Sequence, residues 1–492
     1  MPVESSVYPN VSKLFDSEGA PLVPSAYSIE EFTLINIDGK DKNITEFITS
    51  FNIIEELFSP VIICNINIRD DENLFADLQL SGQEKINLSI KIIPIAGNSA
   101  SDEISLEFLV KEYPNFRKTT DAINVQEYSL VAISNFAYIS QLTRISKAIP
   151  DPRETFLNPI DEIKYIFENN LKEGLGSNYS ISISEDVVSK FKGNITLRSP
   201  LAAIEFLRTK SYDVNNAPFF VYNKISGGTF NHINIKSLTA ILNEDVYYAN
   251  KDDERAYNYT AGFVNAALTD PGDPDYYKKL KLRILSLNAN LKINKLKQGS
   301  AGVYGNSLQI YRYAFKDTIS HQFDPYATAA PNPAILPGLA PQGTKPFANL
   351  KYNDDSKGVV TLGEAEELSN YIRTELHLPP AQTPADINSG FKTAPEIYVD
   401  VLNNTKYYYS RLQEDQNIEI EVYGDFNFNP GVKIQLVFPK AQMFDDESTG
   451  GDEPDPIISG LYIIIFATHE FRAGLYTTRL NLIKLVEEDT PQ

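Results

Sequence analysis

The 492-residue chain has one cysteine, no tryptophan and no long apolar run. Cys64, its single cysteine, excludes an internal disulfide and any zinc site built from several thiolates, and a lone thiol suits a reducing compartment. The most apolar stretches, 61–68 and 461–467, are far shorter than the roughly 20 residues of a membrane-spanning helix. The first ten residues lack the basic start and apolar centre of a secretory signal. We therefore expect a protein that is made in a cytoplasm and has no membrane partner.

Basic residues are outnumbered, with 44 Lys and Arg against 65 Asp and Glu and a formal charge of −21. A sequence-independent nucleic-acid binder needs basic stripes that displace counterions, and the longest basic cluster is KKLKLR at 278–283. Two interpretations of the acidity stay open. The acids confer solubility, or they keep passing nucleic acid from adhering by like-charge repulsion.

Patterns that indicate catalysis or metal binding are missing. No histidine stands three or four residues from another, so the helical two-histidine metal motif is absent from His232, His321, His377 and His469. His469 and Glu470 are disfavoured as an acid–base pair because neighbouring strand residues point to opposite faces, and we interpret His469 as structural. The acidic turn at 270–275 lacks the bidentate glutamate of a calcium loop. The sequence predicts no cofactor, no metal, no catalytic residue and no enzyme activity.

The first third of the chain alternates apolar and polar residues with period two. This pattern predicts antiparallel strands with one buried face, and short turns between them favour a barrel or sandwich over residues 30–145. The runs are Phe32–Asp38, Cys64–Arg69, Ile86–Lys91, 104–110 and 125–133.

The period then changes to that of a helix. Apolar residues from 160 to 171 share one face behind Asn158 as N-cap and Pro159 in the first turn, and Gly174 and Gly176 end the helix. Further elements are predicted as follows: a helix opening at Ser199–Pro200, a hairpin over 218–236, a hairpin over 287–316, a proline-rich excursion over 325–346, and helices near 363–376 and 395–414. Strands return at 418–424, 432–438, 460–468 and 475–485, so the chain is β, then α+β, then β.

Both ends of the chain resemble one protein family. GDFNFNPGVKIQLVF (424–438) and SGLYIIIFATHEFRAGLYTTRLNLIK (459–484) resemble the final barrel of contractile-tail hub proteins. Pro430 presets a turn in which Gly431 supplies a positive φ, and Gly460 begins the next strand. His469 and Tyr476 fall on the last hairpin, where the family often places a histidine and an aromatic residue.

The N-terminal segment YPNVSKLFDS, which begins with Tyr8, Pro9 and Asn10, is similar to the opening of the T-even phage hub. Weaker similarity runs through 51–91, 199–222 and 305–315. The resemblance extends to the hub part of type VI secretion and tailocin spike proteins.

The resemblance implies an α+β fold that is mainly β, with two antiparallel β-barrel-like domains and an α+β region between them. We expect an N-terminal barrel over 1–148, an α+β domain over 149–285, a split C-terminal barrel over 286–320 and 395–488, and an insertion over 321–394. Three such chains would form a ring that adapts a sixfold tail tube to a threefold spike and leaves a channel for DNA.

The implied partners are two further copies in a homotrimer, the spike, the tail tube or a tube-initiator protein, and baseplate wedge proteins. DNA would pass through without specific binding, and the protein would reside in the virion tail. Because the chain stops at Gln492, soon after the last predicted strand, we expect the spike to be a separate chain. Two alternatives stay open. One is a wedge or peripheral baseplate component; the other is a carbohydrate-degrading tail enzyme with paired carboxylates, which the lack of tryptophan disfavours.

Overall fold

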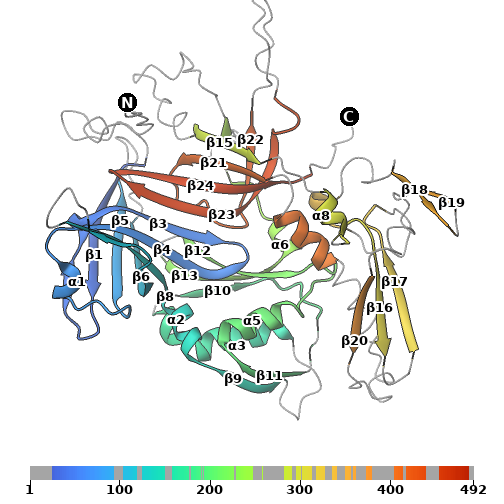
Figure 1. The fold of residues 1–492 in the computed structure, drawn as a ribbon, viewed down its shortest axis with the longest axis horizontal. Coiled ribbons are helices and arrows are strands. Elements are labelled where there is room, and N and C mark those ends of the chain that lie inside the picture. Colours follow the sequence, from blue (N-terminus) through green and yellow to red (C-terminus); the bar gives the residue numbers. More distant parts are fainter. Residues whose placement is uncertain are drawn as a thin grey trace, which may run out of the picture.

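In the computed structural model (Figure 1), the described residues are 25–93, 103–118, 125–149, 158–176, 179–189, 191, 193–226, 229–247, 257–258, 282–290, 295–300, 302–312, 317–326, 335–340, 350–355, 358–361, 373–378, 404–413, 417–438 and 454–486. The fold is mostly β. Its main feature is a large curled sheet that forms a half-barrel, accompanied by a few helices.

The first β region confirms the period-two prediction. Inward side chains such as Phe32, Ile66, Leu88, Phe108 and Leu130 form one apolar core. Its elements are β1 (Tyr27–Ile35), β2 (Asp41–Asn43), a 3-10 helix (Thr45–Phe47), β3 (Ile48–Glu56), β4 (Ser59–Asp70), α1 (Leu74–Asp77), β5 (Lys85–Ile92), β6 (Glu103–Glu112), β7 (Phe116–Lys118) and β8 (Gln126–Ser134).

The middle region packs helices against a small sheet, in the order β10–β13–β12. Its elements are α2 (Asn135–Leu142), β9 (Ile145–Ile149), α3 (Pro159–Asn170), α4 (Lys172–Leu175), β10 (Ser180–Ile183), β11 (Gly193–Arg198), α5 (Pro200–Arg208), β12 (Phe219–Ser226), β13 (Thr229–Ser237) and α6 (Leu238–Leu242). The predicted caps are confirmed, since the Asn158 and Ser199 side chains accept hydrogen bonds from the first-turn N–H groups of α3 and α5. Gly174 lies inside α4, so of the two predicted stop glycines Gly176 alone follows a helix end.

The part of the chain from residue 257 onward contains the four predicted final strands. Its elements are β14 (Tyr257–Asn258), β15 (Ile284–Asn290), α8 (Lys295–Ser300), β16 (Asn306–Arg312), β17 (Asp317–Phe323), a 3-10 turn (Pro337–Leu339), β18 (Lys351–Asp354), β19 (Gly358–Thr361), β20 (Arg373–Leu378), a helix over 404–413, β21 (Asn417–Tyr423), β22 (Lys433–Val437), β23 (Gly460–Arg472) and β24 (Leu475–Lys484).

The two β regions share one sheet, in the order β15–β21–β24–β23–β3–β4–β8–β6–β5–β1–β2. Pairing of β23 with β3, from Phe466↔Glu56 to Arg472↔Ser50, joins them. At the other side, Ala26 bridges Leu475, so the start of β1 also reaches the β23–β24 hairpin. The tip of this hairpin therefore contacts both edges of the curled N-terminal strands, which are far apart in sequence from it (Figure 1).

Two predictions of local structure were wrong. Residues 287–316 do not form a hairpin, because β15 pairs with β21 whereas β16 pairs with β17 and β20 in a separate sheet. Residues 373–376, predicted as helix, belong to β20, which pairs in parallel with β16; 363–372 lie outside the described residues. In both cases a strand partner elsewhere in the chain overrode the local pattern.

The helix near 395–414 is confirmed over 404–413, where Tyr408 and Leu412 are buried. No helix among the described residues is long and apolar enough to cross a membrane. The division of the chain at 148, 285, 320 and 394 stays a prediction.

Candidate functional site

The candidate site is the junction where the β23–β24 hairpin meets β3, at which polar side chains are buried in the core. Alternation along β3 directs Phe51, Ile53 and Glu55 inward, and alternation along β23 directs His469 and Phe471 inward beside them. Aromatic rings from three adjacent strands stack here. The Phe51 and Phe471 centroids lie 4.5 Å apart with nearly parallel planes, and the Tyr476 ring of β24 stacks on Phe471 at 4.5 Å. The hairpin thus contributes aromatic side chains to the N-terminal core.

A polar network lies beside this stack. His469 Nδ1 is 2.7 Å from Tyr476 Oη, and Nε2 is 3.4 Å from Glu55 Oε2. The Ile225 N–H at the end of β12 donates a hydrogen bond to Glu55 Oε1, so the middle region is connected as well. The side chains of Glu55, His469 and Tyr476 are essentially inaccessible to solvent. A buried polar group stabilises a fold only when it has partners, and here each ring nitrogen and each carboxylate oxygen has one.

Burial dominates the electrostatics of this network. It raises the pKa of Glu55, and the hydrogen bond and charge of His469, the Ile225 N–H and the Lys224 charge offset part of that increase. Burial also raises the pKa of the Tyr476 hydroxyl, and it lowers the pKa of Lys224. Each of these pKa shifts favours the uncharged form of the side chain in the core. The arrangement therefore suits a structural connection between three regions of the chain.

Two glycines of the C-terminal motif, Gly424 and Gly431, lie close to tyrosine side chains. A Cβ on Gly424 would lie 2.2 Å from the Tyr476 ring, so a larger residue cannot occupy this position while the ring stays in place. Gly431 has φ of +84°, the positive value that the Pro-Gly pattern predicts, and a Cβ there would lie 3.1 Å from Tyr222 Oη. Its N–H donates to the Ile464 carbonyl at 2.8 Å, which fixes the turn against β23.

The structure brings only some of the predicted signature residues together. His469 and Tyr476 are in direct contact, whereas Pro430 is buried in the turn before β22 and Gly460 begins β23. Tyr8, Pro9 and Asn10 lie outside the described residues, as does the acidic turn at 270–275.

The other histidines lie apart from the junction. His232 is on β13 beside Ser180, His321 is on β17, and His377 is on β20. Within the described part of the chain, no group of three or more His, Cys, Asp or Glu side chains is arranged to hold a metal. Glu470 points away from His469 and forms an ion pair with Arg479 at 3.0 Å, as expected for neighbouring strand residues.

Sequence reasoning missed Glu55 and Gly424. Glu55 occupies an inward position of an otherwise apolar alternation, Phe51–Ile53–Glu55, and an acid at such a position is the signal that could have identified it. Gly424 begins the C-terminal motif, but its close approach to Tyr476 depends on a side chain 52 positions later. No local pattern carries that information.

Comparison with known proteins gave matches among solved structures only; no family model and no curated protein sequence matches the chain. The structure is similar to a tail protein from Neisseria meningitidis MC58, with 10% identity over 93% of this chain and 97% of that chain and a TM-score of 0.42. It is also similar to the 43 kDa tail protein of prophage MuSo2 from Shewanella oneidensis, with 10% identity over 92% and 98% and a TM-score of 0.43. The E. coli c3393 protein, a component of the type VI secretion system, gives 7% identity over 94% and 77% and a TM-score of 0.39. All three TM-scores are below 0.5, and these matches assign no role to this chain.

Proposed function

We propose that this chain is the structural hub of a contractile-tail baseplate, a homotrimeric ring between the sixfold tail tube and the threefold spike. The observation that carries the proposal is the pairing of β23 with β3, which unites two β regions of one chain in a single curled sheet. Under this proposal each chain supplies two β regions in a fixed relation, and three chains supply six. The resemblance of both chain ends to hub proteins supports the same assignment.

A hub must transmit load between tube and spike without its two units separating. The buried Glu55–His469–Tyr476 network and the stacked rings favour this, because a shift of β23 along β3 would leave buried polar groups without partners. A one-residue slip would also move His469 from the core to the outer face.

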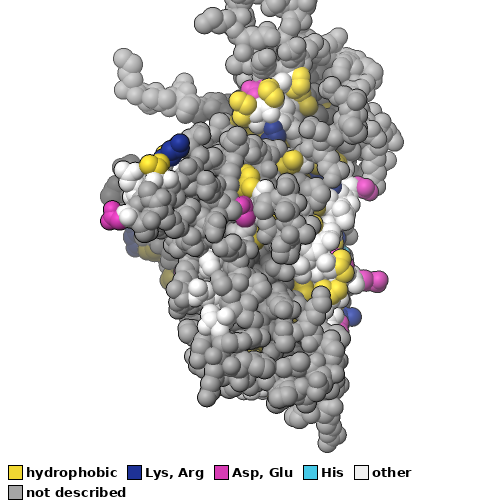
Figure 2. Space-filling view, turned by 90° about the vertical axis from the view of Figure 1, so that its right-hand side faces the viewer, with side chains coloured by type: hydrophobic (Ala, Val, Ile, Leu, Met, Phe, Trp, Pro, Cys, Tyr) yellow, Lys and Arg dark blue, Asp and Glu magenta, His cyan; other side chains and the backbone are white. Residues whose placement is uncertain are grey.

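The ring would leave a channel through which DNA passes without specific binding. Three copies carry a formal charge of −63, three times the −21 of one chain. Figure 2 shows described Lys and Arg side chains at separate places on one face of the molecule. We expect Asp and Glu to outnumber Lys and Arg on the channel wall, since phosphate contacts to a basic wall would hold the DNA.

Copy number tests the assignment. Quantitative mass spectrometry of purified tails should give three copies of this chain per tail for a hub, whereas six or more copies would indicate a wedge component. Incubation of the chain with peptidoglycan should release no soluble sugar; release would favour the tail-enzyme alternative.

A further inference from the structure

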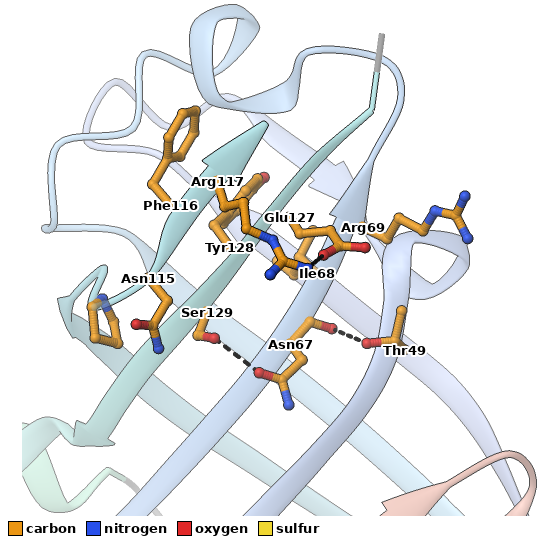
Figure 3. A pocket seen from close by; sticks show the side chains of 11 residues that line it. Thr49, Asn67, Ile68, Arg69, Asn115, Phe116, Arg117, Glu127, Tyr128 and Ser129 are labelled. Carbon is orange, nitrogen blue, oxygen red and sulfur yellow. Dashed lines mark hydrogen bonds and ion pairs between the residues drawn. The ribbon is translucent and has the colours of Figure 1, made fainter. Parts of the chain in front are cut away.

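A surface groove of about 600 Å³ crosses the outer face of the N-terminal strands (Figure 3). Residues on β3, β4, β7 and β8 line it, together with the 114–115 segment before β7. Small-molecule sites have volumes of this order, and the sheet beneath makes this one rigid. It takes no part in the function proposed above.

The floor of the groove is a row of uncharged polar side chains held in place by one another. Ser129 Oγ donates to Asn67 Oδ1 at 2.9 Å, and Asn67 Nδ2 donates to Ser50 Oγ at 3.0 Å. Thr49 Oγ1 donates to the Asn67 carbonyl at 3.1 Å (Figure 3). Asn115 continues the row beside Ser129, whose N–H donates to the Asn115 carbonyl at 3.2 Å. Such hydroxyls and amides both donate and accept, which is the requirement of a ligand rich in hydroxyl groups.

A second row is charged and unbalanced. Glu127 stands opposite Arg69 on β4 and opposite Arg117 on β7, so one carboxylate faces two guanidinium groups. Its ion pair is with Arg117, at 3.0 Å. No hydrogen bond or ion pair links the Arg69 side chain to another residue that the structure describes. In a chain with a net charge of −21, this surplus guanidinium matches a ligand carboxylate, for which its fork of N–H donors is suited.

An aromatic ring completes the groove. Phe116 is 50% exposed, although its ring also stacks on Tyr128 at 6.0 Å. Figure 3 shows Phe116 and Arg69 on opposite sides of the Arg117–Glu127 pair. An exposed ring, a row of hydroxyl and amide groups and a spare guanidinium thus match the apolar ring face, the hydroxyls and the carboxylate of one kind of ligand.

We propose that this groove binds an acidic oligosaccharide, with its carboxylate at Arg69, its hydroxyls along the Asn115–Ser129–Asn67 row and one ring face on Phe116. Binding occurs without cleavage. Glycoside hydrolysis uses a pair of carboxyl groups, and Glu127 is the single carboxylate among the described residues that line the groove.

Titration calorimetry of the purified full chain with tetragalacturonic acid tests this. We expect saturable binding, and we expect Arg69→Gln to weaken it about tenfold, which corresponds to the loss of one charge-assisted hydrogen bond. Phe116→Ala should weaken it severalfold. Lys118→Gln is the matched control, because it removes the same charge from an exposed side chain of β7 that does not line the groove, and it should leave affinity unchanged. Unchanged melting temperatures would show that the variants are folded.

Several results would overturn the proposal. Absence of binding at millimolar tetragalacturonic acid would do so, as would equal weakening by Arg69→Gln and Lys118→Gln, which indicates nonspecific charge attraction. Equally tight binding of neutral maltotetraose would remove the role of Arg69. Full displacement by inorganic phosphate or by duplex DNA at equal charge concentration would indicate a general anion site or a nucleic-acid site.

Discussion

The two halves of β23 differ in what surrounds them. Tyr462, Ile463, Ile464 and Ile465 are all buried, because one face of this half packs in the cluster around Tyr407 and the other in the cluster of the C-terminal strands. From 466 to 472 burial alternates, with His469 and Phe471 inward and Glu470 and Arg472 outward. The first half of β23 therefore packs among C-terminal residues, and Phe471 of the second half packs in the N-terminal core. A polar residue is accommodated in the second half because partners from β3 and β24 meet it there.

The largest loss of stability is expected from a substitution at Gly424, whose backbone lies against the Tyr476 ring of the hairpin. Gly424→Ala places a Cβ against the Tyr476 ring and should cost more than about 3 kcal/mol in the free energy of unfolding, since neither the ring nor the backbone can move freely in the core. Gly39→Ala is the control: its φ is +81° but no atom lies within 4 Å of the new Cβ, so only backbone strain of about 1 kcal/mol applies. Urea unfolding of both variants measures the difference. Equal losses would mean that the approach to Tyr476 is not tight.

A smaller loss is expected when the polar half of β23 is made apolar. His469→Leu removes the imidazole partner of the Tyr476 hydroxyl and leaves a Glu55 oxygen without a hydrogen-bond partner in the core, and it should reduce the free energy of unfolding by about 2 kcal/mol. The double variant with Glu55→Leu should be less damaging than the sum of the single variants, because both ends of the broken contact are then apolar. Strictly additive losses in urea unfolding would contradict a coupled pair.

The dependence of stability on pH isolates Glu55. Its pKa is raised in the folded chain, so its contribution is fully present below the usual glutamate range and is lost as pH rises through the folded pKa. Glu55→Gln lacks this titration. The stability of the parent minus that of Glu55→Gln should therefore decrease as pH increases from about 4.5 to 7.5. If urea unfolding shows that this stability difference increases over the same pH range, then His469 and Lys224 affect the pKa of Glu55 more than burial does.

The smallest effect is expected on the outward face of the same hairpin. Arg479 is 43% exposed and pairs with Glu470 and Glu419. Arg479→Gln should change the unfolding free energy by less than about 1 kcal/mol, because solvent screens exposed pairs. A loss as large as that of His469→Leu would remove the contrast between the two faces.

Local patterns in the sequence predicted most strands of both β regions, though not β3, and the helices that begin at Pro159 and Pro200. These elements depend on residues within a few positions of one another. The junction does not, since Glu55 and His469 are 414 positions apart and neither has a local motif that predicts the other. For the same reason β15 was given the wrong partner: its alternation fits any antiparallel neighbour, and β21 lies 127 positions beyond its end. The turn at Gly431 was predictable because proline and glycine set it locally.

The most direct test of the hub assignment is an electron cryomicroscopy reconstruction of intact tails that contain this chain, with an antibody label on an affinity tag. The assignment predicts three copies around the tail axis, between tube and spike, each with both β regions facing the tube. Six copies around the periphery, or copies at the distal end of a fibre, would contradict it.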